Sequence, residues 1–323
     1  PVRDGVCSGS HSVALQWCDW QVREILPSLA GQPTIIPSHF FIVGNQEPTV
    51  LLEGILFGEG PRWHEDRLWF SDMWGGKVMT VDMDGNTQHV AQFNHPSGLG
   101  FMPDGSLLVS VMHERRIYRI HSGETTLHAD LTDIATEITN DMVVNNEGCA
   151  YVGTDLKNVA LVGPDGKARL VAEGMRGPNG LAITPDGETL VVNETRGEAI
   201  RSFSIEPDGS LGSPQFFAEL PGLFPDGLCL DEEGAAWIGS PPLDAEHYGD
   251  GQFLRVLPGG EITDRIETPG RWAIAPMLGG PDRRTLFMTT SSVENVALLK
   301  ETDKVEDGRI EMIHVAVPGA GLP

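Results

Sequence analysis

Three features of the sequence predict an all-β fold, a six-bladed β-propeller with a central metal site. Six similar segments recur, and their anchors lie 38 to 47 residues apart, which is the spacing of four-stranded propeller blades. Each segment contains short runs of β-branched and aromatic residues bounded by turn residues such as Pro-Asp-Gly. No window of the repeats sustains the 3.6-residue period of an amphipathic helix. We therefore expect sheets arranged radially around a channel.

The repeats align on one column, which is the first residue of the first strand in each blade. The anchors of this column are Glu59, Ser97, Asn140, Asn179, Asp226 and Trp272. The second repeat shows the pattern of four strands: GLGF, the turn MPDGS, LLVSV, RIYRI and TTLHADL. The propeller is expected to occupy residues 46–323.

Closure of the ring is predicted to use both ends of this region. The sixth repeat supplies WAIAP, TLFMTT and IEMIHVAV, so its fourth strand is missing. The run TVLLEGI at residues 49–55 precedes the first anchor and is expected to complete that blade. Residues 1–45 fit no repeat and are interpreted as an N-terminal extension, either a short helix packed on the propeller or a mobile segment.

Charge and composition exclude several classes of partner. The chain has 22 Lys+Arg against 46 Asp+Glu, a net charge of −24, and such a surface repels nucleic acid and anionic membranes. No apolar run reaches the roughly 18 residues of a membrane span, and the start lacks the layout of a signal peptide. Four cysteines are too few for a disulfide scaffold. We expect a cytoplasmic protein.

The anchor column predicts a metal site, because its members meet at one end of the channel. Glu59, Asn140, Asn179 and Asp226 carry side-chain oxygens, and this set suits Ca²⁺, with Mg²⁺, Mn²⁺ or Zn²⁺ as alternatives. Taken singly, Asn179 and Asp226 are also compatible with ordinary turns. The run DEEG at 231–234 fills the turn position of the fifth repeat, which leaves Asp226 in the column.

The second-to-third strand connections are expected to form the rim of this site. They include Met73, Trp74, His113, Glu114, Asp155, Asn193, Glu194 and the segments starting at Ser240 and Ser291. Trp74 and Trp272 predict an aromatic wall that contacts the substrate, with plain packing as the alternative. His113 is a candidate for proton transfer near the metal. The long segment 240–252 is either a lid or solvated surface.

Over residues 50–318 the sequence resembles the SMP-30/gluconolactonase/luciferin-regenerating-enzyme-like (LRE-like) propellers. The motifs are GEGPRW at 58–63, TNDMVV at 139–144, GPNGLAITPDG at 177–187, PDGLCLDEEG at 225–234 and GGPDRRTLF at 279–287. The resemblance implies that Glu59, Asn179 and Asp226 bind the metal and that Asn140 is a further ligand or a substrate contact. It also implies that Asp226 is the catalytic acid-base residue. The animal sugar lactonases have an arginine two residues before the asparagine that corresponds to Asn140, where this chain has Ile138.

These observations predict a calcium-dependent hydrolase that acts on a small lactone or a related ester. The metal would polarise the carbonyl group, and Asp226 would act either as general base or as nucleophile. Two alternatives stay open: a phosphotriester hydrolase on the same scaffold, and a non-catalytic calcium-binding interaction propeller. The loss of an arginine at position 138 and the aromatic rim favour lactones with apolar substituents over sugar lactones.

Overall fold

The described part of the chain is built from β-strands. The computed structural model describes residues 47–241, 250–292 and 306–321. These ranges contain 24 β-strands and one 3₁₀-turn, η1 (Thr195–Gly197), but no α-helix. None of their helical segments is long and apolar enough to cross a membrane. The predicted all-β fold is confirmed, whereas the expectations for residues 1–45 fall outside the described residues.

Four sheets are each made from four strands that follow one another in the chain and pair antiparallel. In the order of the sequence the strands are β2 (Gly58–His64), β3 (Arg67–Asp72), β4 (Lys77–Val81) and β5 (Thr87–Gln92); β6 (Pro96–Phe101), β7 (Leu107–Val111), β8 (Arg116–His121) and β9 (Glu124–Asp130); β10 (Thr139–Val144), β11 (Ala150–Thr154), β12 (Asn158–Val162) and β13 (Ala168–Ala172); β14 (Pro178–Ile183), β15 (Thr189–Glu194), β16 (Ala199–Ser204) and β17 (Gln215–Glu219). These sheets match the first four predicted repeats.

The remaining strands form one eight-stranded sheet. Its members are β18 (Leu228–Leu230), β19 (Ala236–Ser240), β20 (Asp250–Val256), β21 (Ile262–Pro269), β22 (Arg271–Gly279), β23 (Thr285–Ser292), β24 (Gly308–His314) and β1 (Thr49–Ile55). The sequence predicts two separate sheets here, but a parallel pair between Asp250 and Arg271 joins β20 to β22. Gly251 permits this contact, because a Cβ atom there would lie 2.5 Å from the Ala273 nitrogen.

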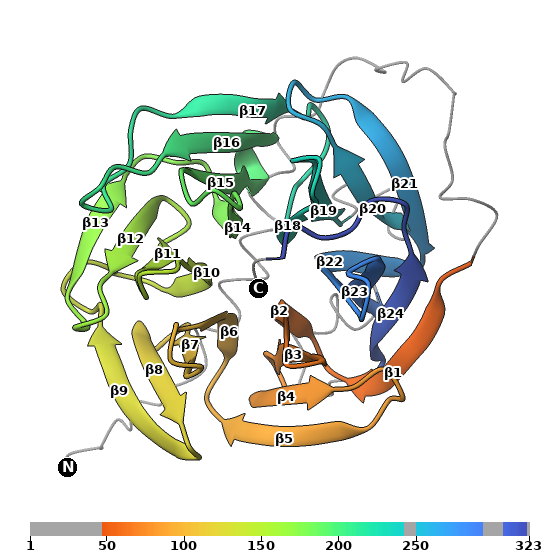
Figure 1. Cartoon of the computed structure of the whole chain (residues 1–323), viewed down its shortest axis with the longest axis horizontal. Coiled ribbons are helices and arrows are strands. Elements are labelled where there is room, and N and C mark those ends of the chain that lie inside the picture. Colours follow the sequence, from red (N-terminus) through yellow and green to blue (C-terminus); the bar gives the residue numbers. More distant parts are fainter. Residues whose placement is uncertain (1–46, 242–249, 293–305, 322–323) are drawn as a thin grey trace, which may run out of the picture.

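The predicted pairing of the two ends of the described region is confirmed. Strand β1 lies antiparallel to β24, with Thr49 opposite Met312 and Ile55 opposite Gly308 (Figure 1). Strand β24 in turn pairs with β23, which pairs with β22. The N-terminal strand therefore supplies the outermost strand of the last group, as the missing strand of the sixth repeat requires.

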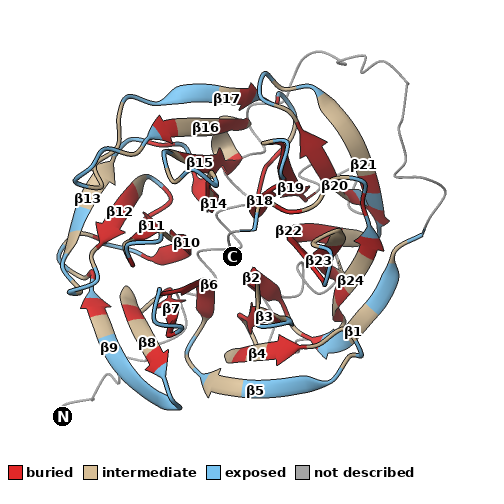
Figure 2. Ribbon diagram, viewed as in Figure 1, coloured by how far each residue is buried: buried red, intermediate tan, exposed pale blue. Residues whose placement is uncertain are grey.

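The innermost strands β2, β6, β10, β14, β18 and β22 surround the centre of the molecule. Each of them contacts the next in this order, and β22 contacts β2 (Figure 1). Burial follows the same arrangement, because every residue of β6 is buried whereas β5, at the outside, is mostly exposed (Figure 2). The first residues of the innermost strands are therefore enclosed by the sheets that carry them.

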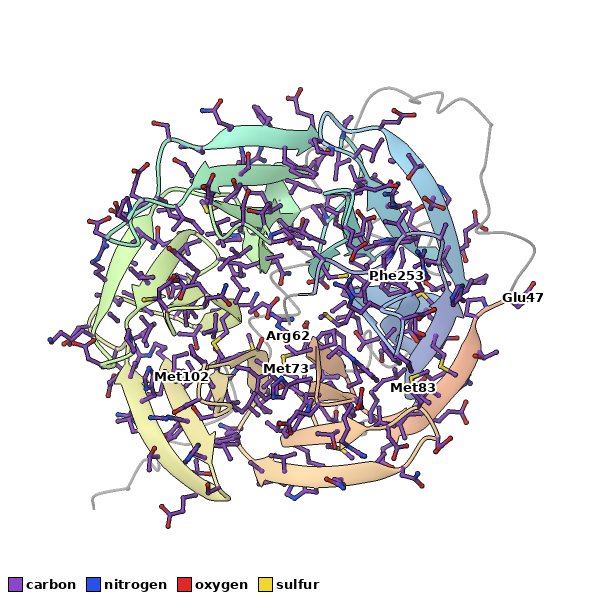
Figure 3. All side chains as sticks on the ribbon, in the orientation of Figure 1. Glu47, Arg62, Met73, Met83, Met102 and Phe253 are labelled. Carbon is purple, nitrogen blue, oxygen red and sulfur yellow. The ribbon has the colours of Figure 1, made fainter. Side chains whose placement is uncertain are left out.

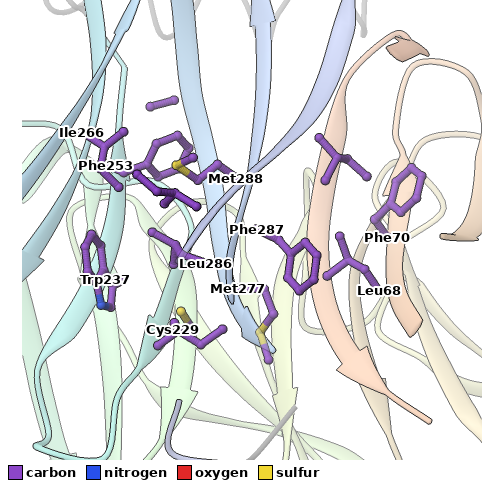
Figure 4. Close-up of a cluster of buried hydrophobic side chains, with 14 of the residues drawn as sticks. Leu68, Phe70, Cys229, Trp237, Phe253, Ile266, Met277, Leu286, Phe287 and Met288 are labelled. Atoms are coloured by element: carbon purple, nitrogen blue, oxygen red, sulfur yellow. The ribbon is translucent and has the colours of Figure 1, made fainter. Parts of the chain in front are cut away.

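Apolar side chains fill the space between neighbouring sheets. The largest cluster lies between the sheet of β2 to β5 and the eight-stranded sheet, and it includes Phe70, Trp237, Phe253 and Phe287 (Figure 4). All four are at most 1% exposed. Full burial of one large apolar side chain contributes about 1.5–3 kcal/mol. This packing holds the innermost strands, and with them the column of anchors, in fixed positions.

Candidate active site at the channel mouth

Five anchors are the second residue of an innermost strand, one place later than the sequence predicts, and Asp226 lies two residues before β18. Glu59 lies opposite Ser71 of the second strand, and Trp272 lies opposite Ser291 in the same way. The Asp226 N–H donates to the Gly239 carbonyl at 2.8 Å, which extends the pairing of β18 and β19 to this residue. The anchors are at most 4% exposed. The column therefore brings six buried side chains, five from strands and one from the segment before β18, to one level of the channel.

The turn that follows β18 supports this alignment of Asp226. The Asp231 carboxylate accepts the N–H of Glu233 at 2.9 Å, just as Asp186 accepts the N–H of Glu188 at 3.0 Å in the previous sheet. Both are side-chain turns of the kind that Asp favours. Asp231, and not Asp226, therefore occupies the turn position, as the sequence predicts.

A chain of hydrogen bonds links four of the anchors. Ser97 Oγ donates to Asn140 Oδ1 at 3.2 Å, and Asn140 Nδ2 donates to Asn179 Oδ1 at 3.1 Å. Asn179 Nδ2 then donates to Asp226 Oδ1. Next to Asn179, a Cβ atom on Gly180 would lie 2.4 Å from the Leu228 nitrogen, so glycine lets β14 approach the chain around Asp226 closely.

Burial disfavours the charged form of the two carboxylates in the column. Burial raises the pKa of Glu59 well above its usual value, and the charges of Asp226 and Asp141 raise it further. Burial also raises the pKa of Asp226 to about 8, with a contribution from Asp141, although the hydrogen bond from Asn179 opposes the shift. An enclosed carboxylate is costly unless a cation or strong donors balance its charge. This part of the channel therefore favours a cation.

The donor set fits a hard divalent cation. Glu59 and Asp226 provide carboxylate oxygens, and Asn140 and Asn179 provide amide oxygens, which are the ligands that Ca²⁺ prefers. Among the described residues no group of three His, Cys, Asp or Glu side chains stands at metal-binding distance, because half of this set consists of amides. Rotating the Asn179 amide by 180° exchanges its oxygen and nitrogen, and would present an oxygen beside Asp226.

Asn193 supports Asp226 and does not lie on the rim, where the sequence places it. It is fully buried, and its Nδ2 donates to the Asp226 carbonyl at 2.7 Å and to the Gly227 carbonyl at 3.3 Å. Thr195 Oγ1 donates to the Pro225 carbonyl at 2.7 Å. Side chains at and just after the C-terminal end of β15, in the neighbouring sheet, thus hold the backbone around Asp226 in place.

Asp155, expected on the rim, is used by the backbone of its own sheet. Its Oδ1 accepts the N–H groups of Thr136, Glu137 and Ile138 at 3.1, 2.7 and 3.1 Å. Only 6% of Asp155 is exposed. These bonds fix the segment that leads into β10, so the carboxylate positions Ile138 and then Asn140 two residues later.

Glu194 and Ser240 are satisfied in a similar way. The Glu194 carboxylate accepts the Arg176 N–H at 2.9 Å and the Arg201 Nε at 2.8 Å. Ser240 Oγ accepts the Phe224 N–H at 3.2 Å. The expectation that these residues line the rim is wrong for their polar atoms, because the chain entering each innermost strand needs partners for its N–H groups. Most of the long segment that follows Ser240 lies outside the described residues.

Apolar side chains surround the channel near the anchor column, and we call this group the mouth cluster. Its buried members are Phe57, Met73, Met112, Ile138, Leu156, Trp272, Ile274 and Ala275, with half-buried Trp74 packed against them. The rings of Phe57 and Trp74 lie 4.1 Å apart between centroids. The structure thus brings together Met73, Trp74 and Trp272, which the sequence places at the mouth.

Phe57, Met112 and Leu156 were not predicted as members. The sequence does contain a signal that places Phe57 at the mouth. Phe57 lies two residues before Glu59, just as Ile138 lies two residues before Asn140. Met112 and Leu156 lie in the second-to-third strand connections, each next to a predicted rim residue, His113 or Asp155. Hydrophobicity alone does not separate a mouth residue from a core residue, and only the packing reveals it.

His113 lies half-buried near Met112 and His95. Its ring centroid is 5.0 Å from that of His95, and burial lowers the pKa of His113. Its Nδ1 is buried and has no hydrogen-bond partner. Glu114, also expected on the rim, accepts a hydrogen bond from the Tyr118 hydroxyl at 2.6 Å.

Arg62 and Asp141 form an ion pair near the centre of the channel, which the sequence did not predict. Arg62 Nη2 lies 3.1 Å from Asp141 Oδ1, and the two side chains are 4% and 6% exposed (Figure 3). Arg62 also donates to the carbonyls of Pro61, at 2.7 Å, and Met142. Burial raises the pKa of Asp141, and the Arg62 charge opposes that shift.

Comparison with known families now adds a second line of evidence. Residues 57–292 match the model of the SMP-30/Gluconolactonase/LRE-like region, and this range includes strands β2 to β23 and every anchor. The chain belongs to this family. The resemblance on which the site residues were assigned is therefore confirmed at the level of the family.

Two named relatives share moderate sequence identity with this chain. A 6-deoxy-6-sulfogluconolactonase of Pseudomonas putida is 28% identical over 293 residues, 86% of this chain and 96% of its own length. The pentonolactonase XacC of Haloferax volcanii is 26% identical over 279 residues, 82% of this chain and 92% of its own length.

The fold is also found among solved structures. Regucalcin from Agrobacterium tumefaciens, described as a calcium-binding protein, superposes with a TM-score of 0.69. The alignment covers 84% of this chain and 95% of regucalcin, at 22% identity. At that identity the likeness shows the fold alone, a propeller-like arrangement of β-sheets.

Proposed function

We propose that this protein is a metal-dependent hydrolase that opens a small lactone or cleaves a related ester. The observation that carries the proposal is the buried chain of Asn140, Asn179 and Asp226 beside Glu59. Two enclosed carboxylates without a fixed cation, joined to neutral oxygen donors at a channel mouth, make a poor structural core but a good cation site. The names of the two lactonase relatives agree with this reaction class.

The proposed cation is Ca²⁺, held by Glu59, Asn179 and Asp226, with Asn140 as a further ligand or a contact to the substrate. Mg²⁺, Mn²⁺ and Zn²⁺ stay as alternatives. A divalent cation would polarise the carbonyl group of the substrate and stabilise negative charge on its oxygen. Four protein ligands leave open positions on a Ca²⁺ ion, which takes six to eight oxygens.

Asp226 is the proposed catalytic residue. In the general-base route, Asp226 takes a proton from water while the water oxygen bonds to the carbonyl carbon. The bond between that carbon and the ring oxygen then breaks, and the proton passes to the departing oxygen. In the nucleophilic route an Asp226 carboxylate oxygen bonds to the carbonyl carbon, the bond from that carbon to the ring oxygen breaks with protonation of the departing oxygen, and water then hydrolyses the mixed anhydride. Label found in Asp226 after one turnover in ¹⁸O-water would identify the nucleophilic route, because water that attacks the Asp226 carbonyl carbon of the anhydride leaves its oxygen in the enzyme, whereas the general-base route never does.

We propose that the substrate is a small molecule bound against the mouth cluster, with Trp74, Trp272 and His113 as contacts. The test is a panel of alkyl, aryl and sugar lactones, assayed with purified full-length protein with and without a chelator. Phosphotriesters are assayed on the same metal-loaded sample. Chelator-sensitive lactone hydrolysis supports the proposal. Hydrolysis of phosphorus esters alone, or stoichiometric metal binding without any hydrolysis, would overturn it in favour of one of the two alternatives.

The architecture and location complete the proposal. We infer that the eight-stranded sheet consists of two blades, β18 to β21 and β22 to β24 with β1, so that the propeller has six blades within residues 46–323. The single bridge between Asp250 and Arg271 that joins them supports this division. A cytoplasmic location is proposed from the composition of the chain.

A further inference from the structure

Trp272 occupies a position in the column that the metal site does not use. Strand β22 contacts β18 on one side and β2 on the other, so Trp272 comes between Asp226 and Glu59 in the circuit of innermost strands. It pairs across its sheet with Ser291, as Glu59 pairs with Ser71. Trp272 is 4% exposed. Its side chain therefore belongs to the same level of the channel as the two carboxylates.

The indole nitrogen of Trp272 has no partner in the structure. Trp272 Nε1 is buried and donates no hydrogen bond. An indole N–H is a donor only, and an enclosed donor normally finds an acceptor. The unpaired group is thus a preformed donor at the mouth of the channel.

An unpaired indole nitrogen is not sufficient evidence for a binding site. Trp237 Nε1 is unpaired as well, and Trp237 lies in the apolar core between sheets, 1% exposed (Figure 4). The position in the molecule separates the two residues. Trp272 stands in the anchor column, whereas Trp237 is part of β19 and belongs to the largest apolar cluster. Trp237 therefore provides a matched control.

The surroundings of Trp272 restrict what it can bind. It packs in the mouth cluster with Phe57, Ile138 and Trp74, which have aliphatic or aromatic surfaces. Of these neighbours only Trp74 has a polar atom in its side chain. A hydroxyl group turned toward these side chains would lack a partner there, which is costly. A ligand with one oxygen acceptor and an apolar substituent would match both the indole N–H of Trp272 and the apolar side chains around it.

We propose that Trp272 is a substrate-binding residue whose indole N–H donates a hydrogen bond to an oxygen of the bound lactone, while the mouth cluster contacts an apolar substituent. The substrate class is accordingly a lactone that carries an alkyl or aryl group and few hydroxyls. This inference rests on the proposed lactone hydrolysis and adds to it the donor and the character of the substrate.

The first test observes the indole group directly. Full-length, Ca²⁺-loaded protein with ¹⁵N-labelled tryptophan is titrated with an alkyl-substituted γ-lactam, whose ring carbonyl resists hydrolysis. We expect the Nε1–H resonance that is missing in Trp272→Phe to move downfield on addition of the lactam. The resonance missing in Trp237→Phe should stay in place. A Trp272 resonance that does not move on saturation with the lactam would overturn the proposal.

The second test uses kinetics. For an alkyl γ-lactone we expect Trp272→Phe to lower kcat/KM about fivefold to tenfold, the range for loss of one hydrogen bond to a neutral acceptor. Trp272→His, which retains an N–H, should recover part of that loss, and Trp237→Phe should show little change. Unaltered kcat/KM in Trp272→Phe would count against the donor role. If Trp272→Phe does not fold, the resonance that is missing in Trp272→His identifies the Trp272 indole, and the titration with the lactam alone decides the donor role.

The substrate class has its own measurement. We expect wild-type kcat/KM for alkyl γ-lactones to exceed that for gluconolactone, and Phe57→Ala to reduce the ratio of the two. A clear preference for gluconolactone would refute the proposed class while leaving lactone hydrolysis intact. Absence of hydrolysis with every lactone would instead refute the proposed function, so the two failures are distinguishable.

Discussion

Two layers of the central channel contain buried carboxylates and balance their charge by different means. In the column of anchors, Glu59 and Asp226 face amide groups, and burial raises the pKa of both. Three residues along the strand from Glu59, Arg62 binds Asp141 at 3.1 Å and fills the channel with a permanent cation. The same innermost strands therefore carry one layer with a built-in positive charge and one without it.

The difference indicates which layer is available for chemistry. The Arg62 guanidinium is always charged, and its donors are taken by Asp141 and by the carbonyls of Pro61 and Met142. That ion pair ties β2 to β10 and gives its layer a permanent positive charge. A bound ion in the other layer would balance Glu59 and Asp226 and still keep open positions for a substrate oxygen. We therefore expect the layer of Arg62 and Asp141 to determine stability and the column of anchors to determine activity.

The largest expected effect is on activity. Glu59→Gln and Asp226→Asn each remove half of the formal charge that faces the cation. We expect kcat/KM for lactones to fall about a thousandfold, since metal polarisation and Asp226 chemistry both depend on this charge. Isothermal titration should show loss of tight Ca²⁺ binding in both variants. Asp186→Asn, in an exposed turn, is the control and should resemble the wild type. Stoichiometric Ca²⁺ retained in both variants would break the comparison.

Arg62→Met tests the other layer. Removing the cation leaves Asp141 buried and unpaired, so we expect a loss of about 3–5 kcal/mol in the free energy of unfolding. The double variant Arg62→Met/Asp141→Leu should regain most of this loss. Arg67→Met, which breaks a more exposed pair with Asp82, should cost about 1 kcal/mol or less. Denaturant unfolding measures all four proteins, and equal costs for Arg62→Met and Arg67→Met would contradict the assignment.

Removal of the metal should affect stability through the column layer alone. The proposed ligands come from β2, β10 and β14 and from the segment before β18, so the ion links distant parts of the chain. A ligand at 100 to 1,000 times its Kd stabilises by about 3–4 kcal/mol, and we expect chelation to lower Tm by about 5–15 °C. Calorimetry with and without chelator measures this. Asp226→Asn should be insensitive to chelator, and an unchanged wild-type Tm would count against a shared site.

The smallest expected effect concerns pH. Asp226 has a pKa of about 8 in the folded, metal-free protein against 3.8 for an ordinary Asp. Between these values the folded state retains a proton that the unfolded state has lost, so stability decreases as pH rises from about 4 to about 8. We expect the Tm of the metal-free protein to fall by several degrees over that range. Asp226→Asn should flatten the profile, and Ca²⁺ should stabilise more at the higher pH. A wild-type profile parallel to that of the variant would disprove this.

Local pattern was sufficient for the strands and for the alignment of the column. The turn chemistry of Asp186 and Asp231 is local, because each side chain bonds the backbone two residues later. This turn locates the second strand of the fifth repeat, β19, and thereby places Asp226 at the entry to the first strand, β18. The pairing of β1 with β24 also followed from the sequence, since a blade that lacks one strand requires it from the other end of the region.

Contacts between sheets were beyond the reach of the sequence. The ion pair of Arg62 and Asp141 joins residues 79 positions apart, and nothing in the local pattern of either residue indicates the other. Asn193 looked like a rim residue until the structure placed its amide against the Asp226 carbonyl. Which residues of different sheets meet depends on how the strands are arranged in space. The repeats in the sequence do not specify these contacts residue by residue.

The sequence by itself determined that the chain forms short strands in repeats and that oxygen-bearing side chains begin several of them. Both properties depend on neighbours within a few residues, through alternation, turn geometry and strand order. Only the tertiary structure decided that β20 joins β22, that Phe57 and Leu156 pack with Trp272, and that the Trp272 nitrogen lacks a partner. The physical reason is that burial and hydrogen-bond satisfaction are properties of the space between sheets, where residues distant in the chain compete for the same contacts.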